Sequence, residues 1–134
     1  MQELLGRISD LDPTVSLGIR VIACFDELVA GKVNIHGLLA TAAALAGCPA
    51  GVQTPSMHTR VSVLGEPLTG DTPETRRQVC VDAQSVVWLE RDGDERPNDA
   101  IILERLALAT GIRLAGSAPE LARRDVAAVS YTHL

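Results

Sequence analysis

Aromatic residues and lysine are scarce in this sequence. Its 134 residues include one Phe, one Trp and one Tyr, and Lys32 is the single lysine. Seventeen acidic residues outweigh 12 basic ones, so the formal net charge is −5. Because binding to nucleic acids depends on a positively charged surface, we expect no direct contact between this segment and DNA or RNA.

Cysteines and long apolar runs are also few. Three cysteines, an odd number, stand far apart, which fits neither a metal-binding CxxC pair nor a disulfide framework. We expect them to be reduced, buried thiols. No signal peptide opens the sequence, and the apolar run at residues 38–46 is much shorter than the roughly 20 residues that span a bilayer. We therefore expect a cytoplasmic protein without membrane contact, metal or other cofactor.

Common catalytic motifs are missing. The sequence contains no GxSxG, Walker, HExxH or GxGxxG motif. Cys80 stands in an alternating apolar pattern, so we interpret it as a structural residue of a strand, although two nearby arginines would activate its thiol if they approached it. A small enzyme that uses Cys80 or His58 is the least favoured alternative, because no base, orienting group or oxyanion donor can be placed beside either residue.

Helical patterns open the sequence. Residues 1–9 predict a short leading helix, and Pro13, which follows an Asp, predicts a helix from there to about Ala30. This second helix has apolar residues on two faces and therefore needs two partners. One partner is the core of the domain, and the other is either a second protomer or a neighbouring helix. Asn34 is a suitable cap for a third helix that ends at Ala46.

Between residues 51 and 90 the apolar period changes from 3.6 to 2, which predicts an antiparallel sheet of four short strands. The residues expected on its packed face are Val52, Thr59, Val61, Val63, Val79, Val81, Val87 and Leu89. A charged turn at residues 91–95 precedes a helix over about 98–110, which we expect to lie on that face. The pattern weakens beyond Gly111, and residues 117–120 form a capping box that predicts a further short helix. This order of elements indicates an α+β fold.

Three arginines are candidates for a ligand site. Arg60, Arg76 and Arg77 lie on or near neighbouring predicted strands, and guanidinium groups hold small carboxylates through paired hydrogen bonds. In the alternative that we favour, these arginines form surface ion pairs with the acidic residues between positions 66 and 74.

Trp88 is the one large flat side chain in the predicted sheet. Its neighbours Val87 and Leu89 belong to the packed face, so Trp88 is expected on the opposite face. There it either lines a ligand cavity or an interface, with the helix of residues 13–30 as a candidate cover, or packs within the chain.

Two runs carry a resemblance to a known family. The run VVWLERDGDERPNDAIILERLALATGIRL at residues 86–114 resembles the closing strand and C-terminal helix of GAF-like sensor domains, in particular those of PucR and CdaR-like bacterial transcriptional regulators. The run LLATAAALAGCPAGVQTP at residues 38–55 is similar to their opening helix and first strand. The resemblance implies a GAF-like antiparallel sheet flanked by N-terminal and C-terminal helices. It also implies a homodimer that passes a signal to a helix-turn-helix.

On this interpretation residues 1–116 form a regulatory domain, and residues 117–134 begin a linker towards an output domain absent from this chain, with a tail whose native origin stays open. Residues 1–33 supply the dimer interface, whose candidates are Leu17, Val21, Ile22 and Leu28. Regulation would act through dimer packing or through a small-molecule effector, for which the candidate ligands are Arg60, Arg76, Arg77 and Trp88. A dimerisation scaffold that binds no ligand is the alternative.

Overall fold

Three helices and five short strands make up the described part of the chain, residues 13–73 and 76–129, in the computed structural model. In chain order the elements are α2 (Pro13–Ala30), α3 (Ile35–Ala46), β1 (Ala50–Thr54), β2 (Met57–Val61), β3 (Pro67–Leu68), β4 (Arg77–Cys80), β5 (Val86–Leu89) and α4 (Asp99–Val129). The leading helix expected at residues 1–9 and the tail beyond residue 129 lie outside the described residues. None of the described helices is long and apolar enough to cross a membrane.

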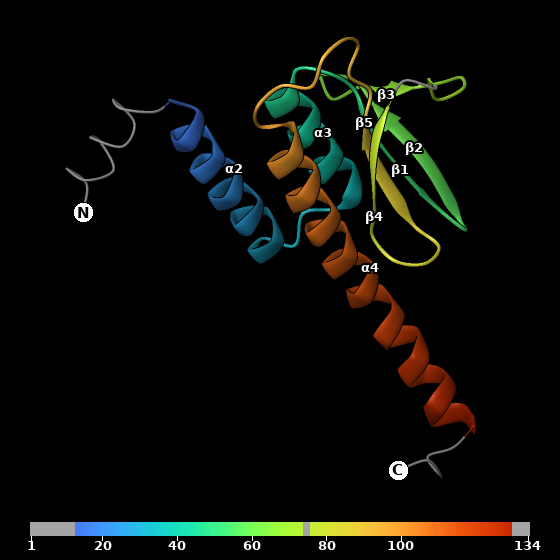
Figure 1. The fold of residues 1–134 in the computed structure, drawn as a ribbon. Coiled ribbons are helices and arrows are strands. Elements are labelled where there is room, and N and C mark those ends of the chain that lie inside the picture. Colours follow the sequence, from blue (N-terminus) through green and yellow to red (C-terminus); the bar gives the residue numbers. More distant parts are fainter. Residues whose placement is uncertain (1–12, 74–75, 130–134) are drawn as a thin grey trace, which may run out of the picture.

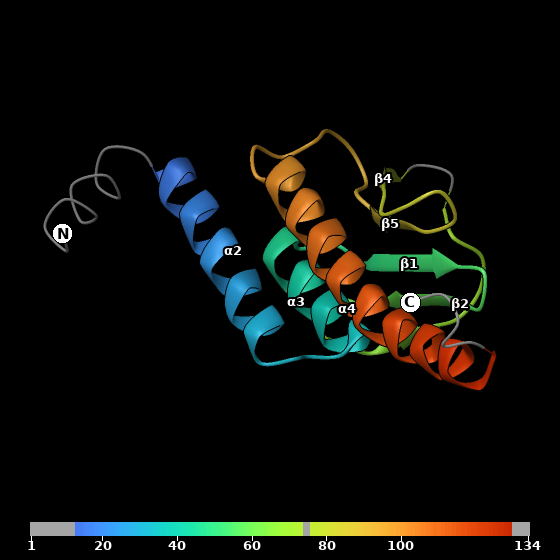
Figure 2. The same ribbon diagram turned by 90° about the horizontal axis from the view of Figure 1, so that it is seen from below.

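The strands form one antiparallel sheet in the order β3-β2-β1-β5-β4. All three helices lie on one face of this sheet (Figure 1). Helices α3 and α4 rest on the strands, and α2 packs mainly against α4 as an outer layer (Figure 2). The expected class, an α+β fold with an antiparallel sheet flanked by helices, is therefore confirmed.

The core lies between the sheet and the helices. Alternate strand residues point towards the helices and are fully buried, among them Val52, Val61 and Val87. The helices contribute Val21, Phe25, Leu38, Leu39, Ile102 and Leu106. Full burial of one large apolar side chain contributes about 1.5–3 kcal/mol, so this set of contacts fixes the helices to one face and leaves the other face of the sheet for polar groups.

The predicted helix ends around α3 are confirmed. The side chain of Asn34 accepts a hydrogen bond of 2.8 Å from the backbone N–H of Gly37, as an N-cap does. At the other end Gly47 adopts the left-handed conformation, with φ of 75°, and its N–H donates to the carbonyl of Ala43. These caps fix where α3 starts and stops and hence where β1 begins.

The C-terminal helix is longer than the sequence pattern predicts. Helix α4 continues without a break to Val129, so the expected helix end after Gly111 and the new helix start at residues 117–120 are both wrong. A Cβ at position 111 would lie 3.4 Å from a methyl carbon of Val81. Gly111 therefore allows α4 to pass close to the end of β4 and does not end the helix.

Two strand predictions are also corrected. Val63 lies beyond the end of β2 and is 40% exposed, and Val81 lies in the turn after β4, where its N–H donates to the carbonyl of Ser85. The two-residue strand β3, which pairs with β2, was not expected. Alternation over two or three residues is too short a signal to fix strand ends.

Candidate functional site

Trp88 lies on the face of the sheet that points away from the helices, as the alternation with Val87 and Leu89 predicts. It pairs directly with Gly51 on β1, and a Cβ at position 51 would lie only 2.2 Å from Cζ2 of the indole. The ring therefore lies flat over the backbone of β1, where glycine leaves room for it. Its exposed fraction is 1%, so Trp88 is covered from the solvent side as well.

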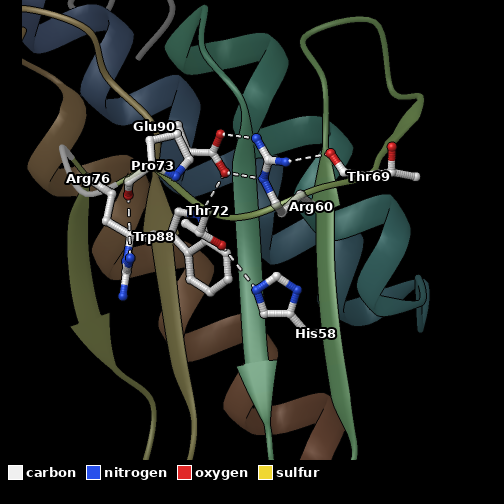
Figure 3. A network of polar contacts seen from close by, with 8 residues as sticks. All are labelled: His58, Arg60, Thr69, Thr72, Pro73, Arg76, Trp88 and Glu90. Atoms are coloured by element: carbon white, nitrogen blue, oxygen red, sulfur yellow. Dashed lines mark hydrogen bonds and ion pairs between the residues drawn. The ribbon is translucent and has the colours of Figure 1, made fainter.

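An ion pair closes over the same glycine. Arg60 on β2 donates from Nε and Nη2 to the two carboxylate oxygens of Glu90, at 2.8 and 2.7 Å, and Nε1 of Trp88 donates to Glu90 at 2.9 Å (Figure 3). Arg60 pairs with Gly51 on one side of β1 and Trp88 pairs with it on the other. Side chains from β2 and from β5 thus meet across the strand that separates them, because that strand carries no side chain at the crossing point.

The carboxylate of Glu90 is held in its charged form by its donors. Burial alone would raise the pKa of Glu90, but the hydrogen bonds from Arg60 and Trp88 and the nearby positive charges outweigh burial and hold the pKa below its usual range. The Glu90 side chain is 4% exposed and that of Arg60 is 11% exposed. Removing either partner would therefore leave the other buried and unpaired.

The cover over Trp88 comes from β2 and from the loop after β3. The ring of His58 lies 5.5 Å from that of Trp88, and its Nε2 is 3.0 Å from the hydroxyl of Thr72. The guanidinium of Arg76 lies 5.4 Å from the centre of the indole, at cation–π distance. Arg60 also donates to the carbonyl of Thr69. The expected cover, the helix of residues 13–30, is wrong, because α2 lies on the opposite side of the sheet.

Three of the four predicted ligand residues come together here. Arg60 and Arg76 both reach Trp88 or its partner, whereas Arg77 pairs with Leu89 and so faces the helices, where it forms an exposed ion pair of 3.5 Å with Glu95. The partner of Arg60 is Glu90 and not one of the acidic residues between positions 66 and 74. The network therefore uses the predicted side chains to hold one another.

A second buried ion pair joins the sheet to the helices, and the sequence pattern had indicated only a charged turn there. Arg91 donates to both carboxylate oxygens of Asp99, at 3.0 and 2.7 Å, and to the carbonyl of Ala46 at the end of α3. Burial would raise the pKa of Asp99, but the hydrogen bonds from Arg91 and from the N–H of Arg96 outweigh it and lower the pKa. This pair locks the start of α4 to the end of α3.

A small cleft of about 220 Å³ separates the two networks. It is lined by Arg76, Arg77, Arg91 and Gly93. Two of its three guanidinium groups already hold a carboxylate, namely Glu95 and Asp99. A surplus of one positive charge, on Arg76, is therefore all that the cleft offers to an anion.

The outer surface of the helices carries a second candidate site. A groove of about 370 Å³ runs between α2 and α4. It is lined by Phe25, Asp26, Val29, Ala30, Arg105, Leu108, Ala109 and Ile112. Leu108 and Ile112 are 50% and 53% exposed, which is unusual for large apolar side chains placed together.

The predicted interface residues separate into two groups. Val21 is fully buried and Leu28 packs against the core, so both face the inside of the chain. Leu17 is 36% exposed and Ile22 is half-buried. Of the two apolar faces of α2, the one that contains Val21 meets α4, and the one that contains Ile22 and the exposed Ile19 points outward.

Comparison with known protein families, with curated proteins and with solved structures finds no match for this chain. Within the described residues, no three His, Cys, Asp or Glu side chains are grouped as a metal site would require. Cys48 is buried and Cys24 half-buried, but Cys80 is exposed, so the expectation that all three thiols are buried is wrong. Inferences about function therefore rest on the two sites above.

Proposed function

We propose that this chain is a GAF-like regulatory domain of a bacterial transcriptional regulator and that it works by dimerisation. The resemblance at residues 38–55 and 86–114 suggests the family, and the sheet order with all helices on one face is compatible with it. In this proposal the sheet is a rigid support and the outer surface of α2 and α4 is the working surface. DNA binding belongs to another part of the parent protein.

The observation that carries this proposal is the length and position of α4. Its first turns are packed in the core through Ile102, Leu106 and Thr110, all essentially unexposed. The same helix then runs on well past the edge of the sheet (Figure 1). A helix that is fixed at one end and free of the domain at the other transmits a change in packing along its axis without loss, as a rigid rod does.

The filled outer face of the sheet favours a dimerisation scaffold over a small-molecule sensor. An effector on that face would have to displace Trp88 and the buried ion pair of Arg60 with Glu90, at the full cost of leaving two charges unpaired. An effector could act on the dimer only through different affinities for two arrangements of the interface. We therefore assign the regulatory role to the contact between protomers.

Native mass spectrometry of the purified, never-denatured chain tests this function, together with light scattering over a wide range of concentrations. A mass of two chains with no added mass is expected. A dimer with a retained small molecule would support sensing in place of the scaffold, and a monomer at every concentration would refute the proposal.

A matched pair of variants localises the contact. Leu108→Glu places a charge on the exposed apolar part of α4 and is expected to weaken the dimer at least about tenfold, since an unpaired charge at an apolar contact costs more than about 1.4 kcal/mol. Leu64→Glu is the control, because Leu64 is 84% exposed in the turn after β2. If both variants stay dimeric, the helices do not form the interface.

A further inference from the structure

The outward face of α2 carries a regular stripe. Ile19, Ile22, Asp26 and Val29 follow one another at spacings of three, four and three residues, which keeps them on one side of a helix. Ile19 is 42% exposed and Asp26 is also exposed, whereas Ile22 and Val29 are half-buried. Asp26 is the one charged residue of this stripe.

The neighbouring face of α4 carries a stripe of the same kind. Ile101, Arg105, Leu108 and Ile112 follow at spacings of four, three and four residues. Arg105 is the one charged residue here, and its sign is opposite to that of Asp26. Both charged residues line the same groove between α2 and α4. Each helix thus offers an apolar seam with a single charge, which is how packed helices select a partner and a register.

Arg105 lacks the partner that a buried guanidinium requires. Its Nε is buried, and no acceptor within the described part of the chain reaches it. No ion pair joins it to Asp26 there, although both line the groove. A buried donor without an acceptor is costly, and more so on a charged group. The groove is therefore incomplete in the single chain.

We propose that a second copy of this chain fills the groove, so that Asp26 of each copy pairs with Arg105 of the other. Helices α2 and α4 run in the same direction and lie side by side in both views (Figures 1 and 2). A two-fold axis along these helices brings residues of equal height together. The groove, which has both charges at one level, is then complementary to itself, and the four helices form a bundle with two ion pairs.

This inference rests on the proposed dimerisation function and names the contact that specifies it. The apolar residues Ile19, Leu108 and Ile112 become buried between copies, and each acceptor-less Arg105 gains a carboxylate. Such a pair contributes chiefly to choice of partner, because a like-charged or neutral partner leaves a charge unpaired at the seam.

Two charge-reversal variants test the pairing. Asp26→Arg leaves two positive charges on each copy, and Arg105→Glu leaves two negative ones. Either variant alone is expected to raise the dissociation constant of its dimer at least about tenfold, because both contacts become repulsive. When the two variants are mixed, every contact joins opposite charges again. The mixture is expected to form a heterodimer about as stable as the wild-type dimer, measured by native mass spectrometry and sedimentation velocity.

The controls are Glu27→Arg and Arg20→Glu, which reverse exposed charges on the same helix but away from the groove. These controls are expected to dimerise like the wild type, and circular dichroism verifies that every variant is folded. A wild-type dimer that both groove variants leave intact would overturn the pairing and keep the proposed function. A weakened mixture with no heterodimer would also overturn it, and a monomeric wild type would refute both proposals.

Discussion

Trp88 lies flat against the backbone of Gly51, so closely that a methyl group at position 51 would come within 2.2 Å of the indole. The same indole donates to Glu90, and Glu90 holds Arg60 from across β1. The absence of a side chain at one position of β1 therefore allows a tryptophan and a buried ion pair to share one face of the sheet. Changes at Gly51 are expected to spread to the whole network.

Gly51→Ala is expected to destabilise the protein by about 1–3 kcal/mol, because the indole must leave its position to avoid overlap with the new methyl group. The one tryptophan of the sequence reports on this directly. Its fluorescence is expected to shift towards the red as water reaches the ring, and the midpoint of urea unfolding is expected to fall.

Gly116→Ala is the matched control for that prediction. Position 116 lies in α4 and no atom lies within 4 Å of a Cβ placed there. Since alanine favours a helix by up to about 1 kcal/mol over glycine, this variant is expected to be neutral or more stable, with unchanged fluorescence. Equal effects of both substitutions would contradict the close contact of Trp88 with Gly51.

Arg60→Met is expected to cost about 3–5 kcal/mol near neutral pH, because it leaves the carboxylate of Glu90 buried without its main partner. The comparison is Arg77→Met, which breaks an exposed pair with Glu95 and is expected to cost about 0–1 kcal/mol. Urea unfolding of both variants at one pH provides the measurement. Similar losses in the two variants would mean that the pair of Arg60 with Glu90 contributes no more than a surface contact.

The stability of the wild type is expected to fall in acid. The pKa values of Glu90 and Asp99 are lower in the folded chain than their ordinary values of 4.5 and 3.8. The unfolded chain therefore binds more protons between the two sets of values, so this stabilisation is present above pH 4.5 and is lost as the pH falls through the folded pKa values. Urea midpoints measured from pH 7 down to pH 3 report the loss.

Two variants separate this effect from general acid sensitivity. In Arg60→Met, burial acts on Glu90 with little opposition and favours its protonated form, so the deficit relative to the wild type is expected to shrink as the pH falls. Asp92→Asn, which changes an exposed carboxylate in the turn before α4, is expected to follow the wild-type profile. A deficit in Arg60→Met that is constant with pH would show that Glu90 does not titrate as its contacts imply.

Local signals in the sequence predict much of the fold. The cap at Asn34 follows from its side-chain chemistry, and the face of Trp88 follows from the alternation with Val87 and Leu89. The helices fail only where a local stop signal meets a tertiary reason for the same residue, as at Gly111 beside Val81. Glycine ends helices in general, but here close packing against β4 requires it.

The partners within the candidate site could not be predicted in the same way. Arg60 and Glu90 are 30 residues apart, and their side chains meet only because β1 lies between β2 and β5 and has glycine at the crossing. Strand order is a property of the whole sheet, and the alternation that placed both side chains on one face carries no information on which strands are neighbours. Likewise, the two apolar faces of α2 indicated two partners, but only packing reveals that the face of Val21 is the internal one.

The accessibility of the cysteines provides the last prediction. Cys80 is exposed, whereas Cys48 is buried, and burial raises the pKa of the Cys48 thiol and so lowers its reactive fraction. We expect one thiol of the folded protein to react rapidly with a maleimide or a disulfide reagent, and all three to react in urea. Cys80→Ser is expected to abolish the rapid phase, and Cys24→Ala to keep it. A rapid phase that survives in Cys80→Ser would contradict the placement of β4. A rate far above that of a free thiol would instead support an activated, enzyme-like cysteine.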